Sequence, residues 1–335
     1  MLNVGVIGYG YWGPNLVRNF MASGETKVVM VCDMSQARID KVAALYPQVS
    51  LTRDPQDLIN DSRIDAVVIA TPVDTHFDLA MDALRAGKHV LVEKPIASTS
   101  EQAQRLVEEA ERRGLVLMVD HTFVYTGAVR KMHELIRKPE FGPVRYYDST
   151  RVNLGLFQSD VNVLWDLAVH DLSIMSYVLD EKPVAVSATG NSHLPGQPEY
   201  VAFLTVFFGG SLIAHINVNW LSPVKIRRTL VGGGNQMIVY DDLETSEKIK
   251  LYDKGITVTE TLEDRRKLLI GYRTGDLWSP KVTETEALGV EVEHFAACIR
   301  DGVAPLTGGE AGLGLVRILE AANQSMRQQG VSVAL

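Results

Sequence analysis

The chain has 335 residues, of which 46% are hydrophobic and 22% charged, as in ordinary globular proteins. At roughly 150 residues per domain, this length indicates two domains with sizeable cores. The 33 basic and 41 acidic residues leave a net charge of −8, which argues against a nucleic-acid or anionic-membrane surface but allows a local pocket for an anionic small molecule.

The two cysteines, Cys32 and Cys298, have no metal-binding spacing and form no disulfide framework, so we expect a reducing, cytoplasmic compartment. A strand is expected from residue 3, with no signal-like segment before it. No apolar run approaches the roughly 18 residues of a membrane helix, and the eight histidines show no ligand spacing. Neither a membrane span nor a metal site is predicted.

Short apolar strands alternate with helices over residues 1–121. The expected strands are Asn3–Ile7, Lys27–Cys32, Ala66–Ala70, His89–Glu93 and Leu115–Val119. The expected helices are Pro14–Ser23, Ser35–Tyr46, Asp74–Ala86 and Glu101–Arg113, the last with Ser98 as its capping residue. Continuous apolar strands separated by helices are typical of a parallel sheet covered on both faces. Residues 1–121 are therefore predicted to form a Rossmann-type α/β domain that binds a dinucleotide.

The pattern changes after residue 122. Turn residues now separate the expected strands Val144–Val152, Val184–Thr189, Tyr200–Phe208, Ser211–Val218, Ile226–Val231 and Met237–Tyr240, and Lys248–Lys281 is interpreted as a loop with short strands. The expected helices are Gly127–Lys138, Leu164–Leu179, Leu288–Arg300 and Ala311–Gln328. This pattern predicts an α+β domain over residues 122–335, with a large, open, mostly antiparallel sheet. Its last helix can pack back on the first domain.

A Gly-x-Gly-x-x-Gly pattern, Gly8, Gly10 and Gly13, follows the first expected strand and opens the first helix. Small residues are needed there because the backbone must approach a pyrophosphate, whose charge then faces the N–H groups of the helix start. Asp33, 20 residues beyond Gly13, can accept hydrogen bonds from both ribose hydroxyls and would repel a 2′-phosphate. The pattern predicts NAD rather than NADP; a glycine turn that binds another ligand is the alternative.

Two groups of residues suit acid–base chemistry. The Glu93-Lys94-Pro95 run lies at the carboxyl end of a predicted parallel strand, where ligands bind in open α/β sheets, and its lysine can stabilise negative charge on a substrate oxygen. Asp166 and His170 share a face of the long predicted helix, so the carboxylate can orient the imidazole as a general base for a secondary hydroxyl. Taken alone, the first pattern more often marks a surface lysine in a strand–helix loop, and the second more often marks a capped or solvated histidine.

Several further runs accompany these motifs: Ala70-Thr71-Pro72 with His76, Ala86–Val90 leading into Glu93-Lys94-Pro95, and Pro305 with Gly309-Glu310. Together with the glycine turn and the Asp166/His170 pair, they resemble the glucose–fructose oxidoreductase and inositol dehydrogenase (Gfo/Idh/MocA) family over nearly the whole chain. The resemblance implies that Lys94, Asp166 and His170 are catalytic and that Pro95 is cis. It also implies a set of cofactor-lining residues: Tyr11, Trp12, Thr71, Pro72, His76, Glu93 and Lys94.

Within that family, the closest resemblance is to bacterial nucleotide-sugar dehydrogenases and ketoreductases, and the segment Asp148–Gln158 carries it. Such proteins act at carbon 3 of a UDP- or dTDP-linked sugar, in pathways to amino or deoxy sugars. The resemblance implies five substrate contacts: Lys94, Tyr125, Arg151, Asn153 and His170. A solvated strand end is the alternative interpretation for Arg151 and Asn153.

The chain departs from the family pattern at Asp120, since glycine is common before the histidine at position 121. It also has Val124 and Thr126-Gly127 where an arginine or an Asn-Pro pair is common. These positions lie near where nicotinamide and substrate should meet. The departures therefore bear on the identity of the substrate more than on that of the cofactor.

Two other functions remain open. One is a dehydrogenase of a free cyclitol or sugar, which needs no diphosphate contacts; the other is a non-catalytic dinucleotide-sensing regulator, which could dispense with Lys94 or His170. In relatives, the open sheet packs against another subunit, so a homodimer or homotetramer is expected. Neighbouring residues of a strand face opposite ways, so at most one of Arg227 and Arg228 can face a ligand. Together with Lys225, they are interpreted as a solvated or subunit-facing edge.

Overall fold

The computed structural model describes residues 1–155, 161–193, 196–258 and 270–335. It divides into two compact units. Unit 1 comprises Met1–Tyr125 and Thr285–Glu320, and unit 2 comprises Thr126–Glu284 and Ala321–Leu335. The last three residues of the Asp148–Gln158 segment and part of Lys248–Lys281 lie outside the described residues.

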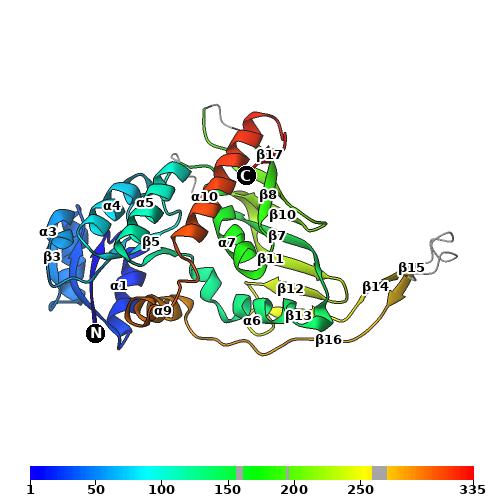
Figure 1. The fold of residues 1–335 in the computed structure, drawn as a ribbon, viewed down its shortest axis with the longest axis horizontal. Helices are drawn as coiled ribbons and strands as arrows, with labels where there is room; N and C mark the ends of the chain where they lie inside the picture. Colours follow the sequence, from blue (N-terminus) through cyan, green and yellow to red (C-terminus); the bar gives the residue numbers. More distant parts are fainter. Residues whose placement is uncertain (156–160, 194–195, 259–269) are drawn as a thin grey trace. The chain divides into compact units, whose positions relative to one another are not determined.

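Unit 1 is built on a six-stranded parallel sheet with the strand order β3-β2-β1-β4-β5-β6 (Figure 1). Its strands are β1 (Leu2–Ile7), β2 (Thr26–Cys32), β3 (Ser50–Thr52), β4 (Ala66–Ile69), β5 (His89–Glu93) and β6 (Leu117–Asp120). The order reverses direction between β1 and β4, and ligands of such folds bind outside the carboxyl ends of the strands at this point. The predicted Rossmann-type sheet is confirmed.

Helices follow the strands of unit 1. They are α1 (Gly13–Ala22), α2 (Gln36–Leu45), α3 (Pro55–Ile59), α4 (His76–Arg85), α5 (Ser100–Arg113) and α9 (Ala287–Asp301), with the 3-10 turns η1 (Val73–Thr75) and η2 (Thr122–Tyr125). The short elements β3 and α3 were not predicted, because three and five residues are too few to show a period.

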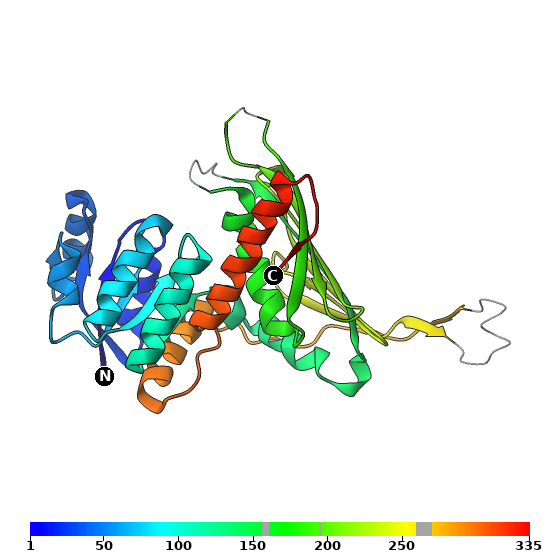
Figure 2. The ribbon, with the colours of Figure 1, turned by 45° about the horizontal axis from the view of Figure 1, so that its top comes forward.

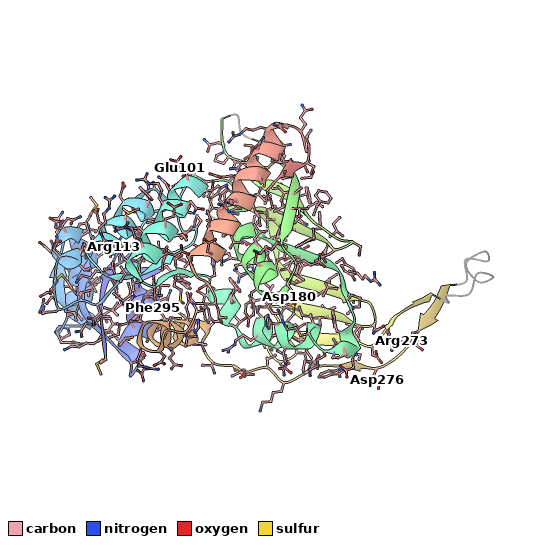
Figure 3. The ribbon with its side chains drawn as sticks, viewed as in Figure 1. Glu101, Arg113, Asp180, Arg273, Asp276 and Phe295 are labelled. Carbon is pink, nitrogen blue, oxygen red and sulfur yellow. The ribbon has the colours of Figure 1, made fainter. Side chains whose placement is uncertain are left out.

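The start of α5 corrects one sequence prediction. Thr99, not Ser98, is the capping residue, and its side chain accepts a hydrogen bond from the backbone N–H of Gln102. Ser98 instead donates from Oγ to the carbonyl of Val73. Figure 3 labels Glu101 in the first turn of α5 and Arg113 at its end, an arrangement of charges that suits the helix dipole.

The segment Thr285–Glu320 groups with unit 1, whereas the sequence analysis assigned it to the second domain. Phe295 of α9, labelled in Figure 3, meets the ring of Phe20 on α1 edge-to-face, with 6.4 Å between ring centroids. Arg18 of α1 donates both guanidinium nitrogens to Glu286. Helix α10 (Gly309–Arg327) continues the same core as far as Glu320. The buried, mostly apolar face of α9, which includes Phe295, therefore decides the boundary, which composition alone does not reveal.

Unit 2 is built on a nine-stranded sheet with the order β16-β13-β12-β11-β7-β10-β9-β8-β17. Its strands are β7 (Val144–Leu154), β8 (Pro183–Asn191), β9 (Val201–Phe208), β10 (Ile213–Asn219), β11 (Leu221–Gly233), β12 (Met237–Asp241), β13 (Ile249–Tyr252), β16 (Leu277–Trp278) and β17 (Val333–Ala334). Only β7 and β10 pair in parallel among these described strands, so the predicted mostly antiparallel sheet is confirmed. A second sheet pairs β14 (Gly255–Val258) with β15 (Ile270–Arg273).

The helical elements of unit 2 are α6 (Gly127–Ile136), η3 (Pro139–Phe141), η4 (Leu164–Ala168) and α7 (Val169–Val178). Figure 2 shows helices against one face of the nine-stranded sheet, while its other face is open. Large apolar side chains are exposed on the strands of this sheet, among them Phe203, Ile213 and Ile226. Among the described residues, no helix combines the length and apolar character that a bilayer crossing needs.

Candidate active site

The glycine turn after β1 combines two kinds of glycine. A Cβ on Gly8 would lie 2.3 Å from the carbonyl oxygen of Ala70, and a Cβ on Gly13 would lie 2.3 Å from that of Gly8, so the protein itself requires both. A Cβ on Gly10 would meet nothing closer than 3.7 Å. The absent side chain at Gly10 leaves room above the turn, where a pyrophosphate approaches the backbone in dinucleotide-binding folds.

Asp33 follows β2 and is held beside this turn. Its Oδ2 accepts from the backbone N–H of Tyr9 at 2.7 Å, and its Oδ1 accepts from that of Ser35 at 2.8 Å. Arg38 approaches Oδ2 at 3.4 Å. Oδ1 of Asp33 keeps a further lone pair, so the carboxylate can still accept a hydrogen bond from a ribose hydroxyl.

Trp12 ties the glycine turn to the far side of the sheet. Its indole Nε1 donates to Oδ2 of Asp120, at the end of β6, over 2.7 Å. Thr122 donates to the other oxygen of the same carboxylate at 2.5 Å. Tyr11, the neighbouring aromatic, is 92% exposed. Of the two aromatics expected to line the cofactor, Trp12 is thus fixed by the protein and Tyr11 projects outward.

The Glu-Lys-Pro run ends β5 as predicted, and the Lys94–Pro95 peptide bond is cis. Oε2 of Glu93 accepts from the backbone N–H of Lys94 at 2.9 Å. Glu93 and Asp120 are register partners on β5 and β6, so both carboxylates project from the same face at the carboxyl ends of the strands. The residue that departs from the family pattern therefore places a second carboxylate beside the Glu-Lys-Pro run.

A third carboxyl group completes this cluster. Glu291 lies on the buried face of α9, is 0% exposed, and makes no hydrogen bond of ordinary geometry with either oxygen. Burial, reinforced by Asp120, raises the pKa of Glu291 and that of Glu93 well above the usual range of a carboxyl group. Two of the three groups are therefore held toward their neutral forms, which removes most of the repulsion that three carboxylates would suffer.

His121, directly after β6, is buried, and neither of its ring nitrogens has a hydrogen-bond partner. Burial and the nearby charge of Lys94 lower the pKa of His121 to about 3. The ring is therefore a neutral imidazole at physiological pH.

In unit 2, the helix that carries Asp166 and His170 does not begin as the predicted α-helix. Leu164–Ala168 is a π-helical turn, closed by a bond from the N–H of Val169 to the carbonyl of Leu164. Asp166 lies in this turn and His170 in the α-helix that follows. Oδ2 of Asp166 accepts from the indole Nε1 of the fully buried Trp220 at 2.9 Å. The α-helix therefore starts five residues later than predicted, so the i, i+4 spacing of Asp166 and His170 does not lie on one regular α-helix. Such π-helical turns are frequent at functional sites.

Arg151, one of the residues that the resemblance assigns to the substrate, is enclosed within unit 2. Its side chain is 3% exposed, and Nε and Nη2 donate to the Asp171 carboxylate at 2.6 and 3.3 Å. Ser149 donates to the same carboxylate at 2.6 Å. The pair joins the centre of the sheet, at β7, to α7. A guanidinium enclosed in this way supports the packing of unit 2.

Tyr125 and His76 are also almost fully buried. Tyr125 is 2% exposed, its hydroxyl is 3.2 Å from Oγ1 of Thr307, and its ring faces His294. His76 is 1% exposed, and both ring nitrogens contact backbone carbonyls. Both side chains therefore pack within unit 1. Asn153, near the end of β7, is half-buried.

The remaining predicted cofactor residues follow β4. Thr71 is half-buried and Pro72 exposed, and Oγ1 of Thr71 lies 2.7 Å from that of Thr75. Of the three cations of β11, the neighbours Arg227 and Arg228 have different partners: Arg228 pairs with Asp241, and the more buried Arg227 pairs with Asp242. Among the described residues, no group of three or more His, Cys, Asp or Glu side chains is placed to hold a metal ion.

Three residues of the site were missed from the sequence. Asp120 was noted as a departure but not as the partner of Trp12; since β5 and β6 are neighbours, the two strand ends were the available signal. Glu291 occupies an apolar stripe with Leu288 and Phe295, and a carboxyl group on such a stripe is itself a signal. Nothing in the local sequence marks Trp220 as the partner of Asp166.

Unit 1 fits a dinucleotide at the carboxyl ends of its strands. Gly10 gives the turn an open approach, Asp33 offers carboxylate oxygens, and the first turn of α1 has no side-chain cap on its N–H groups. NAD needs these three features for its pyrophosphate and ribose. The fit rests on described contacts within this one unit.

Two models of one protein family match the chain. The oxidoreductase family model with the NAD-binding Rossmann fold (GFO_IDH_MocA) matches residues 2–121, and the GFO/IDH/MocA C-terminal domain model matches residues 129–239. Together they cover more than half of the chain.

Among the curated relatives, two match over most of this chain and a third matches over about half of it. A UDP-N-acetylglucosamine 3-dehydrogenase of Acidithiobacillus ferrooxidans is 26% identical over 96% of this chain and 96% of its own. The scyllo-inositol 2-dehydrogenase (NAD(+)) of Bacillus subtilis is 24% identical over 91% and 87%. The oxidoreductase YdgJ of Escherichia coli is 38% identical, but the match spans only 49% of this chain and 46% of YdgJ.

Solved structures share the fold. That of the Acidithiobacillus ferrooxidans 3-dehydrogenase GnnA has a TM-score of 0.82 at 24% identity, covering 97% of this chain and 98% of its own. That of GenD2 from gentamicin A biosynthesis, in complex with NAD, has a TM-score of 0.83 at 22% identity, covering 100% and 96%. At these identities the likeness supports the fold alone.

Proposed function

The chain belongs to the Gfo/Idh/MocA family of oxidoreductases, and from this premise we propose that it transfers a hydride between NAD and carbon 3 of a nucleotide-linked sugar. The observation that carries the proposal is the dinucleotide cradle of unit 1, in which Gly10, Asp33 and the Glu93-Lys94-Pro95 run lie at the carboxyl ends of strands of one sheet. A 26% identical relative that spans 96% of both chains, and that is named for carbon 3 of UDP-N-acetylglucosamine, supports this choice of substrate class.

Each proposed catalytic residue has a defined task. Bound NAD supplies the hydride acceptor, the nicotinamide ring. His170 accepts the proton of the substrate hydroxyl and returns it to the ketone oxygen in the reverse direction. The ammonium of Lys94 stabilises the negative charge that develops on that oxygen. The carboxylate of Asp166 orients His170. One oxygen of this carboxylate, Oδ2, accepts a hydrogen bond from the indole of Trp220 at 2.9 Å.

The cofactor preference follows from Asp33. A carboxylate 2.7 and 2.8 Å from two backbone N–H groups is held in place and cannot turn away from a ribose. It therefore accepts hydrogen bonds from a 2′-hydroxyl and repels a 2′-phosphate, which favours NAD over NADP.

Oxidation of a free cyclitol is the second candidate. A relative named scyllo-inositol 2-dehydrogenase (NAD(+)) is 24% identical over 91% of this chain. The enclosure of Arg151 also favours it, because this cation was the expected phosphate contact and is engaged by Asp171. The two candidates differ in whether the nucleotide is needed for turnover.

Deuterium transfer tests the proposal at the level of the reacting carbon. The enzyme is incubated with NAD⁺ and UDP- or dTDP-sugars that carry deuterium at carbon 3, and the reduced cofactor is analysed by mass spectrometry. We expect NADD with at least one nucleotide sugar. Reduced cofactor containing only protium would show oxidation at another carbon and would overturn the assignment of carbon 3.

The open face of the nine-stranded sheet supports a homo-oligomer. Phe203, Ile213 and Ile226 are exposed by 37–45% on it, although side chains of this size gain about 1.5–3 kcal/mol each when buried. We propose that a second copy of the chain covers this face. Light scattering should give a multiple of the monomer mass, and Phe203→Asp should lower it; a monomeric wild-type protein would contradict the proposal.

A further inference from the structure

His76 bridges two loops of unit 1 that come from neighbouring strands. Its Nδ1 lies 2.8 Å from the carbonyl oxygen of Pro95, after β5, and its Nε2 lies 2.9 Å from that of Thr71, after β4. The side chain is 1% exposed, so water cannot replace either contact. The two bridged loops carry residues proposed for the active site: Lys94 directly precedes Pro95, and Thr71 and Pro72 follow β4.

Both contacts require a donor on the ring, because a carbonyl oxygen only accepts hydrogen bonds. A neutral imidazole carries one N–H and can therefore satisfy one of the two carbonyls. An imidazolium carries two and can satisfy both. The observed pair of short distances is thus fully hydrogen-bonded only when the ring is protonated.

The surroundings of the ring act on its charge in both directions. Burial and the charge of Lys94, at the end of β5, lower the pKa of His76. The two carbonyl contacts and the charge of Asp74, in η1, raise it. Burial is the largest effect, so the net direction is downward and the second hydrogen bond forms only as the pH falls.

We propose that His76 is a positioning residue that clamps the loop of Lys94 to the loop of Thr71 and Pro72, and that its second hydrogen bond is lost when the ring loses a proton. The proposal rests on the proposed function, because the clamp acts through the NAD site. It assigns to His76 a task within the protein instead of a contact with the cofactor. A clamped pair of loops holds the nicotinamide end of the site in one arrangement before NAD binds, which lowers the cost of binding.

Two substitutions weaken the His76 clamp to different extents. His76→Gln keeps one donor within reach of one carbonyl, and His76→Phe keeps a ring of similar size with no donor. His89→Gln is the matched control, because His89 also lies on unit 1 and makes one backbone contact, accepting from Val116 N–H at 2.9 Å. Circular dichroism and thermal unfolding identify variants that fail to fold.

NADH binding, followed by fluorescence titration, is the main measurement. At a pH below the titration of His76, where the wild-type ring makes both bonds, we expect the Kd to rise about tenfold in His76→Gln and about 100-fold in His76→Phe, and to stay within about twofold in His89→Gln. Wild-type affinity should fall as the pH rises through the titration of His76, and His76→Gln should lack this dependence. A folded His76→Phe protein with wild-type Kd would overturn the proposal.

Nitrogen NMR of the histidine rings separates this proposal from the proposed function. In the wild-type protein, assigned through the His76→Gln spectrum, we expect one protonated ring nitrogen at about pH 8 and two once the pH has fallen through the titration of His76, whose pKa burial lowers. A single protonated nitrogen down to the lowest pH at which the protein stays folded would overturn the two-bond clamp. A wild-type protein that binds no NADH but gives the expected NMR result would refute the proposed function and leave the clamp intact.

Discussion

The hydrogen bond between the indole of Trp12 and the carboxylate of Asp120 connects the glycine turn, near the middle of the unit 1 sheet, to the edge strand β6. Trp12 belongs to the glycine turn after β1, and Asp120 ends β6, yet Nε1 and Oδ2 are 2.7 Å apart. A hydrogen bond to a charged group is worth about 1.5–3 kcal/mol. The bond therefore holds the turn in place relative to the strand ends from which Glu93 and Lys94 follow.

Replacement of Trp12 by phenylalanine should weaken NADH binding about tenfold. Phenylalanine keeps the ring but removes the donor, so the turn loses its tether to Asp120. Fluorescence titration measures the effect. Trp278→Phe is the control, because it makes the same exchange at a side chain that is 44% exposed on β16 of unit 2; equal losses in both variants would contradict the tether.

Glu291→Gln should stabilise the protein, and the gain should depend on pH. The pKa of Glu291 is raised in the folded state, so between the unfolded value near 4.5 and the folded value the native protein holds a proton that the unfolded chain releases. Stability of the wild type then falls as pH rises, by about 1.4 kcal/mol per pH unit from this group. The variant has no such loss.

Urea unfolding at several pH values measures this difference. The stability gap between Glu291→Gln and wild type should widen from about pH 4.5 upward and level off above the folded pKa. Glu293→Gln, an exposed neighbour on α9, should give no such gap. A Glu291→Gln protein that is less stable than wild type at pH 7 would mean that the carboxyl group is ionised and bound in the native state.

Asp33→Ser should shift the cofactor preference toward NADP. Removal of the carboxylate ends its repulsion of a 2′-phosphate, and Arg38, now 3.4 Å from Asp33, remains beside the vacated position. We expect the ratio of NADPH to NADH affinity to rise about tenfold, which corresponds to about 1.4 kcal/mol. Asp40→Ser, on the exposed side of α2, is the control; an unchanged ratio in Asp33→Ser would place the ribose elsewhere.

His170→Asn should lower kcat by about 100- to 10,000-fold and leave NADH affinity unchanged, since it removes the proposed acid–base group. Steady-state kinetics with the substrate that turns over, together with the NADH titration, measure both quantities. His215→Asn, on a half-exposed strand position beside Phe203, is the control. Wild-type kcat in His170→Asn would transfer the proton-carrying role to Lys94.

Arg151→Met should destabilise the protein by about 3–5 kcal/mol, because it leaves the buried carboxylate of Asp171 without its partner. Arg228→Met removes an exposed ion pair with Asp241 and should cost no more than about 1 kcal/mol. Urea unfolding compares the two variants. Loss of substrate affinity in Arg151→Met at unchanged stability would restore the role that the resemblance implied for this arginine.

The fold was largely predictable because its signals are local. Apolar runs marked β1, β2, β4 and β5, and the glycine spacing with Asp33 marked the cofactor half. What escaped prediction depends on partners that are distant in sequence. Asp120 meets Trp12 across 108 residues, and Phe295 packs on Phe20 from a helix that the sequence placed in the other domain.

The predicted roles of individual side chains were less secure for the same reason. A family motif assigns a role to a residue by its position in the sequence, but the contacts that its side chain makes depend on how the folded unit buries it. Arg151, Tyr125 and His76 are each almost fully enclosed by their own unit, where they contact Asp171, Thr307 and two backbone carbonyls, respectively. The π turn at Asp166 likewise depends on packing that a helical pattern does not encode.

One measurement tests the central claim most directly: the absorbance of reduced nicotinamide after the enzyme is mixed with NAD⁺ and, in parallel, UDP-N-acetylglucosamine, N-acetylglucosamine and myo-inositol. The account predicts that NADH forms with the nucleotide sugar and not with the free sugar or the cyclitol. Turnover of myo-inositol, without turnover of the nucleotide sugar, would contradict it and establish the cyclitol dehydrogenase instead.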